Sequence, residues 1–229
     1  MKKLILALAL CAFAFASCGD DDENGGNNGN TSSFDGTITG KLKRVLEEKV
    51  DDVWTKKYDG DVTDEVDEIR AITYGVGNEE NITLCTVPVT NGQFTIKLTT
   101  PGSESLKNIA NEMADGLTIS NRSAKCSYVH FSGYKDGMRV SSINMHPSNL
   151  SEKIGVAMLY VDNDVNVSGT LVFDDDDATE KYTYEVNMNL KKGWNTVVDK
   201  LVKENHASMT TAGIPANMTW GIWVYNNDK

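Results

Sequence analysis

The three histidines are the residues best suited to acid–base or metal chemistry, yet His130, His146 and His206 are isolated from one another in the sequence. A helix-borne zinc hydrolase would need two histidines one helical turn apart. The stretch Gly-Ser-Glu-Ser-Leu at residues 102–106 lacks the second glycine of a nucleophile elbow. No glycine-rich phosphate loop occurs either. The sequence therefore argues against metal hydrolases, serine hydrolases and nucleotide-binding enzymes, and we expect no cofactor.

Acidic side chains outnumber basic ones, with 33 Asp and Glu against 22 Lys and Arg and a net charge of −11. An acidic surface repels phosphate backbones, so we expect no nucleic-acid partner. Residues 162–166 offer oxygens at alternating positions, as calcium loops do, but Phe173 stands where such a loop needs a bidentate Glu, and we expect no metal site. Paired carboxylates of a glycoside hydrolase are defined by their distance in space. A carboxylate-dependent hydrolase therefore stays open as the less favoured alternative.

Two cysteines, Cys85 and Cys126, lie in strand-like stretches. In an oxidising compartment a disulfide between them would close a long loop and contribute about 2–4 kcal/mol. Alternatively, each thiol is free and acts as a small buried hydrophobe. The sequence leaves both alternatives open.

Aromatic side chains are the remaining candidates for ligand contact, because exposed rings stack on sugars. Trp54 lies in a charged segment, and Trp223 and Tyr225 share the face of the last strand that is opposite Trp220. We take Trp54, Trp223 and Tyr225 as a candidate stacking set. The alternative is that these rings are structural, since large aromatics dominate small β cores.

The N-terminal residues 1–17 have the order of a secretory signal peptide: Lys2 and Lys3, an apolar run, then small residues. Phe15-Ala16-Ser17-Cys18 resembles the lipobox of bacterial lipoproteins, although Phe15 departs from the usual Leu. The acidic residues 20–23 resemble the surface-export signal of Bacteroidetes lipoproteins. The resemblance implies that Cys18 carries the lipid that anchors the protein in the outer membrane, with the protein displayed at the cell surface.

A polar segment that we call the tether, residues 18–33, follows the signal peptide. Residues 19–33 contain no apolar side chain, so residues 18–33 are expected to be a lipidated Cys followed by a disordered acidic, Gly- and Asn-rich segment. Residues 34–229 are long enough for one domain or for two packed β halves, at residues 34–101 and 124–229.

Hydrophobic residues in this region alternate with a period of two, which is typical of half-buried strands. Turn signals at Asn91-Gly92, Asp136-Gly137 and Lys192-Gly193 separate them. We predict an all-β fold, an antiparallel β-sandwich of about ten strands. Residues 154–161 are apolar at nearly every position and are predicted to be a central strand covered on both faces. The spacing of apolar residues in 103–113 predicts one short helix.

Two further resemblances concern the fold. Residues 36–40 and 87–98, with the step Asn91-Gly92-Gln93-Phe94, resemble the ends of transthyretin-like and carboxypeptidase-regulatory-like sandwiches. The step at residues 190–195 and the Trp-rich last strand are similar to uncharacterised Bacteroidetes surface lipoproteins. These motifs are turns and strand ends, so they imply a fold and a location and transfer no active site.

Together these features predict a lipid-anchored, non-enzymatic module of the cell surface that binds a ligand or takes part in envelope assembly. The alternative is a glycan-binding surface lipoprotein that is accessory to nutrient uptake, with a glycan or an envelope protein as partner.

Overall fold

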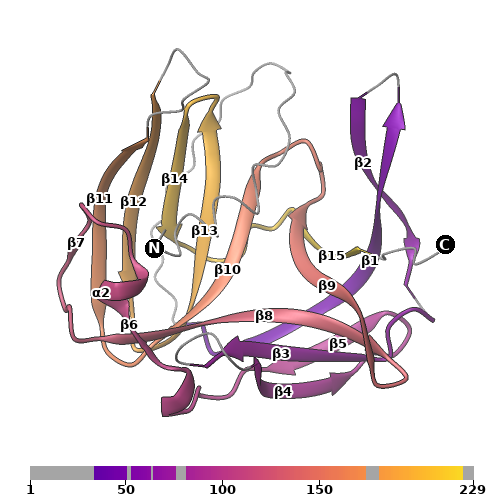
Figure 1. Cartoon of the computed structure of the whole chain (residues 1–229). Coiled ribbons are helices and arrows are strands. Elements are labelled where there is room, and N and C mark those ends of the chain that lie inside the picture. The colour runs from indigo at the N-terminus through magenta and orange to yellow at the C-terminus, as the bar shows by residue number, and fades with distance from the viewer. Residues whose placement is uncertain (1–33, 51–52, 63, 76–80, 174–180, 224–229) are drawn as a thin grey trace.

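A computed structural model describes residues 34–50, 53–62, 64–75, 81–173 and 181–223 (Figure 1). Within these ranges the protein is all-β, and its fifteen strands join in one connected sheet. Cys18, Tyr225 and the acidic residues 174–177 lie outside the described residues. The strands are β1 Thr37–Val50, β2 Val53–Asp61, β3 Glu68–Tyr74, β4 Asn81–Pro88, β5 Gln93–Lys97, β6 Lys107–Asn108, β7 Thr118–Ile119, β8 Lys125–Lys135, β9 Met138–Pro147, β10 Ile154–Val161, β11 Val165–Phe173, β12 Tyr182–Leu190, β13 Gly193–Lys203, β14 His206–Thr211 and β15 Met218–Trp223.

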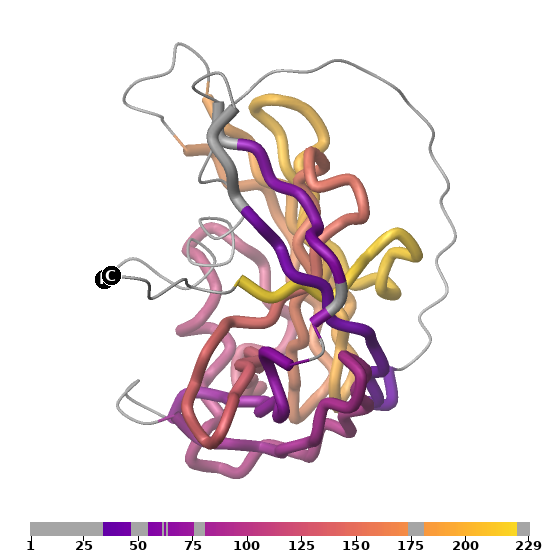
Figure 2. The backbone as a smooth tube through the Cα atoms, turned by 90° about the vertical axis from the view of Figure 1, so that its right-hand side faces the viewer, coloured from indigo at the N-terminus to yellow at the C-terminus, as the bar shows by residue number. Residues whose placement is uncertain are grey.

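The long strand β8 joins two parts of this sheet. On one side, β10, β13, β14, β12, β11 and β7 follow one another as the upright sheet in Figure 1. On the other side, β9, β15, β1 and β2 follow. In addition, β3 pairs with the opposite edge of β8, β4 pairs with β3, and β5 pairs with the start of β1. Figure 2 shows β1 and β2 running together obliquely across the molecule. Because β1 and β15 pair, strands from both ends of the described chain belong to the same part, and the sheet does not divide between residues 101 and 124.

The topology differs from the expected antiparallel sandwich of about ten strands. The sheet is mixed, because β1 pairs with β15 and β12 pairs with β14 in parallel. Local turn signals could not reveal either pairing, since a parallel partner must come from a distant part of the chain. The turn at Asn91-Gly92 forms, with both residues at positive φ, and Thr90 and Gln93 exchange two hydrogen bonds of 2.9 Å. However, β4 and β5 then separate to pair with β3 and β1.

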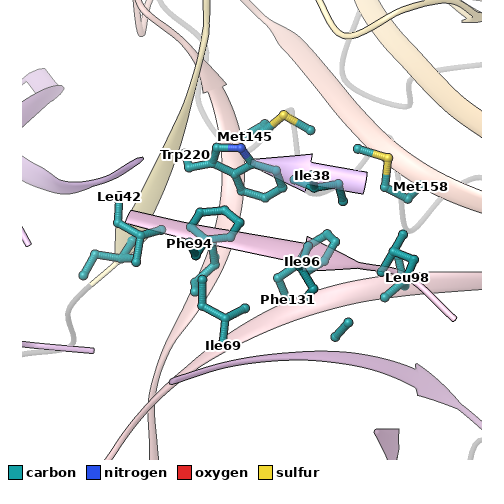
Figure 3. Close-up of a cluster of buried hydrophobic side chains, with 14 of the residues drawn as sticks. Ile38, Leu42, Ile69, Phe94, Ile96, Leu98, Phe131, Met145, Met158 and Trp220 are labelled. Carbon is teal, nitrogen blue, oxygen red and sulfur yellow. The ribbon is translucent and has the colours of Figure 1, made fainter. Parts of the chain in front are cut away.

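Two hydrophobic cores fill the molecule, and β10 lies between them. Leu159 and Val161 belong to the core of the upright sheet, whereas Met158 and Tyr160 belong to the core around Trp220 (Figure 3). The continuous apolar pattern of β10 is explained by this double cover, because residues 158–161 are buried on both faces and residues 154–157 are half-buried. The prediction of a central strand at residues 154–161 is therefore confirmed.

The predicted helix over residues 103–113 is much shorter in the structure. It is divided into a 3-10 turn, η1 (Ser103–Ser105), and a single α-helical turn, α2 (Ile109–Glu112). Between them β6 pairs with β8, which holds the backbone extended. Asn108 caps α2, since its side-chain oxygen accepts a hydrogen bond of 2.9 Å from the Ala110 N–H. The apolar residues Ile109 and Met113 still enter the core of the upright sheet.

Candidate functional site: a groove between β9 and β10

Strand β8 changes its hydrogen-bonding partner halfway along its length. Its first half pairs with β10, ending at Val129 opposite Met158. Its second half pairs with β9, beginning at Phe131 opposite Ile143. Two strands cannot occupy the same edge of β8, so β9 and β10 diverge at this point (Figure 1). The divergence makes a fork in the sheet, with His130 at its base.

A groove of about 360 Å³ occupies this fork. Its walls come from β9 and β10, and its floor comes from β8, with further residues from β3, the segment around α2, and β15. The lining residues are Thr73, Tyr74, Ser105, Lys107, Glu112, Cys126, Ser127, Tyr128, Val129, His130, Phe131, Ile143, Asn144, Met145, Val156, Ala157, Met158 and Trp220. Most of them are apolar or uncharged, and Glu112 is the one carboxylate among these described lining residues.

Trp220 gives the groove a rigid apolar wall. The edge-to-face contacts of its indole with Phe94 and Phe131 have centroid distances of 5.4 and 5.3 Å (Figure 3). Such contacts between aromatic rings favour one orientation of the indole. Gly40 makes room for this orientation, because a side chain there would collide with the Trp220 ring. The shape of the wall is therefore set before any ligand arrives.

His130 and Tyr74 supply polar groups at the base of the fork. Their rings lie 4.3 Å apart, and Tyr74 is 43% exposed. Burial, followed by the positive charge of Arg139, lowers the pKa of His130. The imidazole is therefore neutral at physiological pH and keeps one nitrogen as an acceptor. Among the described residues its buried Nε2 has no hydrogen-bond partner.

Buried hydroxyls bridge β3 and β8 next to this base. The hydroxyl oxygens of Thr73 and Ser127 are 2.5 Å apart and form a hydrogen bond inside the protein. Asn144, on β9, is exposed and presents its amide at the rim. The groove thus combines apolar walls with a few neutral hydrogen-bonding groups.

The inner end of the groove lies against the core of the upright sheet. Cys126 and Tyr128 belong to or pack against that core, and Glu112 comes from α2. Burial raises the pKa of the Tyr128 hydroxyl well above its ordinary value, and the nearby Cys126 and Glu112 raise it further. Tyr128 therefore stays neutral, so this end of the groove offers a phenol and a carboxylate.

The residues predicted to stack on sugars lie on β2, on β15 or beyond the described residues. Trp223 is half-buried, with the Lys56 ammonium 5.1 Å from its ring centre and the His146 ring against its edge. Trp54 pairs with Lys49 near the end of the β1–β2 hairpin, while Trp223 pairs with Val45 closer to the body. Tyr225 lies outside the described residues. Trp223 is therefore the one member of the set with a described side-chain environment.

The disulfide between Cys85 and Cys126 is not formed, and both thiols are free. Cys85 pairs with Ala71, and Ala71 pairs with Phe131, so β3 separates Cys85 from β8. Cys126 lies a further 17 Å or so along β8, at about 3.4 Å per residue, whereas bonded cysteines have Cα atoms within about 7 Å. Burial raises the pKa of Cys126 to about 12, so this thiol is unreactive.

The acidic residues at 162–166 have structural partners. Asp162 accepts a hydrogen bond of 2.7 Å from the Lys125 N–H, and Asp164 accepts one of 2.8 Å from the Lys192 N–H. These contacts join the ends of neighbouring strands. Within the described ranges, no three His, Cys, Asp or Glu side chains are grouped so that they could hold a metal ion.

The groove was not among the sequence-based candidates. In the sequence His130 is isolated from the other histidines, and Tyr74, Tyr128 and Asn144 belong to no recognisable motif. What brings them together is the change of partner along β8, which depends on strand register between distant segments. The sequence offered one indirect sign, the unbroken apolar pattern of β10, which places β10 at the boundary of two cores.

The chain matches no family model, no curated protein and no solved structure in our comparisons. Neither helical segment in the described ranges has the length and apolar character that crossing a bilayer requires.

Proposed function

We propose that the protein is a non-enzymatic binding module, held at the outer surface of the outer membrane by a lipid on Cys18, and that its ligand binds in the groove between β9 and β10. The observation that carries the proposal is the groove itself, about 360 Å³ in volume, with a preorganised aromatic wall. Binding pockets for small molecules typically have volumes of about 300–1,000 Å³, with mostly apolar walls and a few polar groups.

The chemistry of the lining favours binding over catalysis. Hydrolysis of a glycoside by paired carboxylates needs two acids about 5–10 Å apart, and Glu112 is the single acid among the described lining residues. His130 is neutral and has Tyr74 against its ring. We therefore assign His130, Tyr74 and Asn144 to recognition of the ligand.

The anchor is supported by the sequence around Cys18. A lipid chain contributes about 0.8 kcal/mol per buried CH₂, so the several chains of a lipoprotein hold firmly. The expected result is that labelled fatty acid is incorporated into the wild-type protein and not into Cys18→Ala. Protease treatment of intact cells should also remove the wild-type protein. Labelling of the Cys18→Ala variant, or complete protection from protease, would contradict the anchor or the surface location.

The groove is tested by filling it. Ala157 on β10 is half-buried and lines the groove, so Ala157→Phe should block it. Val202→Phe is the matched control, because Val202 is 56% exposed and is not a lining residue. In a ligand-observed NMR screen of small molecules and oligosaccharides, compounds that bind wild type should also bind Val202→Phe. The same compounds should not bind Ala157→Phe. Ligands that bind all three proteins equally would show that the groove is not the site.

Glycan binding at Trp223 is the second candidate function. It is favoured by the neighbourhood of Trp223, Tyr58 and two lysines, since Lys43 and Lys56 lie 5.6 and 5.1 Å from the ring centres of Tyr58 and Trp223. A glycan array of the domain that starts at residue 34 should then show binding that Trp223→Ala or Trp54→Ala abolishes and Ala157→Phe leaves intact. Glycan binding lost only in Ala157→Phe would place the sugar in the groove instead.

A further inference from the structure

Asp199 is a buried acid for which the fold gives no obvious reason. It lies in β13, opposite Gly155 of β10 on one side and Met209 of β14 on the other. Its side chain shares a face with Val197 and Leu201, which pack in the core of the upright sheet. Asp199 is only 5% exposed, and neither carboxylate oxygen has a hydrogen-bond partner among the described residues. Buried polar groups in native proteins are nearly always hydrogen-bonded, so this one needs an explanation.

Two tyrosine side chains, Tyr184 and Tyr182, lie near Asp199. The Tyr184 hydroxyl, on a side chain that is 1% exposed, is close enough to favour the ionised carboxylate. It nevertheless makes no hydrogen bond of ordinary geometry within the described chain. Tyr182 and Tyr128 lie near Tyr184, and Tyr182 also lies near Asp199. A buried carboxylate without hydrogen-bond donors is a chemical environment that favours a cation, through charge pairing and charge-assisted hydrogen bonds.

Asp199 is not a lining residue of the groove, but it lies close to the groove along β10 and β13. Ala157 and Tyr128 line the inner end of the groove, and both side chains lie on the same side of the upright sheet as Asp199. From Ala157, the next position of β10 on that side is Gly155, which pairs directly with Asp199. A Cβ atom on Gly155 would be 3.7 Å from the Asp199 Cβ. The strand between the groove and Asp199 therefore presents only a methyl group and a hydrogen atom.

We propose that the ligand of the groove carries a protonated amine, and that this amine pairs with the Asp199 carboxylate beside Tyr184 while the apolar body of the ligand lies in the groove. The inference rests on the proposed function, because it uses the same groove. One positive charge balances one carboxylate, whereas a divalent ion would leave an excess charge in the core. The amine also gives the carboxylate the hydrogen-bond donors that it lacks in the described chain.

The titratable groups that face Asp199 make the pairing dependent on pH. On β12 they are Tyr184 and Tyr182, while Gly155 on β10 and Met209 on β14 do not titrate. Burial raises the pKa of Asp199 to about 6, and burial together with Asp199 raises the pKa values of both tyrosines. Between pH 5 and pH 7.5 Asp199 is therefore the member of this cluster that changes charge, and an amine should bind more tightly at the higher pH.

Two probes of the same shape test the proposal: phenethylamine, which is protonated at neutral pH, and phenethyl alcohol, which is neutral. Titration calorimetry of each probe would compare wild type, Asp199→Asn and Ala157→Phe. Wild type should bind the amine about tenfold to a hundredfold more tightly than the alcohol, as for hydrogen bonds to a charged group. Asp199→Asn should bind both probes with the weaker affinity that wild type has for the alcohol, and this affinity should not depend on pH. Ala157→Phe should bind neither probe.

The outcomes separate the two ideas. Equal affinity of wild type for amine and alcohol, or an unchanged amine affinity in Asp199→Asn, overturns the pairing of an amine with Asp199. Either result leaves the proposal of a binding site in the groove standing. Binding of neither probe to wild type also overturns the pairing of an amine with Asp199. The library screen with Ala157→Phe then shows whether the groove is a binding site. Near-UV circular dichroism of Asp199→Asn verifies that the isosteric variant is folded.

Discussion

At the scale of single residues, the side chains that stand out are polar groups in apolar surroundings. Asp199, His130 and His146 all have buried atoms without hydrogen-bond partners within the described chain. Burial shifts each pKa toward the neutral form, upward for the acid and downward for the two histidines. These groups therefore link the stability of the protein to pH.

Asp199 should make the protein less stable as pH rises. The pKa of Asp199 is about 6 when folded and 3.8 ordinarily, so between these values the folded protein keeps a proton that the unfolded chain has lost. The stability due to this proton is fully present below about pH 4 and is lost as pH rises to about 6, a change of about 3 kcal/mol at 1.36 kcal/mol per pKa unit. Urea unfolding from about pH 4 to 8 should show this decrease as a difference between wild type and Asp199→Asn, because the opposite contributions of His130 and His146 are common to both proteins. Parallel pH profiles for the two proteins would contradict it.

Gly40 should be intolerant of any side chain. The Trp220 indole occupies the space that a Cβ atom on Gly40 would need, and the Phe94 ring lies against the same space. Gly40→Ala should therefore reduce the free energy of unfolding by about 1–3 kcal/mol, as overpacking does. Gly213→Ala is the control, since a Cβ at Gly213 meets nothing within 4 Å. Equal denaturant midpoints for the two variants would mean that Trp220 is free to move.

At the scale of elements, the sequence predicted best where structure is local. The alternation of Tyr182, Tyr184, Val186, Met188 and Leu190 predicts one buried face of β12, and all of them are buried except Tyr182, which is half-buried. The Asp136-Gly137 turn also joins β8 and β9 as expected of a hairpin. Prediction failed at residues 107–108, where helical spacing of apolar residues was overruled by pairing with β8. Tertiary contacts of this kind override a local preference for helix, which is weak by comparison.

Strand β10 should be the most sensitive element. Leu159 is fully buried in one core while its neighbours Met158 and Tyr160 fill the other. Leu159→Ala should cost about 2–5 kcal/mol, because the surrounding sheet cannot collapse into the cavity. Val172→Ala, at a site that is 56% exposed on β11, should change stability little. Thermal unfolding of both variants tests this, and similar melting temperatures would argue against a rigid position for β10.

At the scale of the whole molecule, the sequence predicted the all-β class but not the arrangement. Composition and period two are sufficient for the class. The mixed topology depends on the parallel partners β15 for β1 and β14 for β12, and sequence periodicity carries no information about register between distant strands. The groove was missed for the same reason, since His130, Asn144 and Ala157 converge only because β8 exchanges β10 for β9.

The two suggested halves should not fold separately. The fragment 34–101 lacks β15, which lies between β1 and β9, and lacks β8, which pairs with β3. It should therefore have a disordered circular dichroism spectrum and no cooperative unfolding, whereas 34–223 should unfold cooperatively. A cooperative transition in 34–101 alone would show that this fragment folds with its own strand pairs, which are β1–β2, β1–β5 and β3–β4.

The pairing of β1 with β15 also has a consequence for export, which the proposed lipid anchor requires. In a chain exported N-terminus first, β1 would emerge long before β15, so Leu42 would lack its partner Trp220 until almost the whole domain has crossed the membrane. Under this proposal the part of the sheet around β1 would be completed only after export. Chains that stop short of β15 would leave that edge of β1 unpaired and would be more open to proteases.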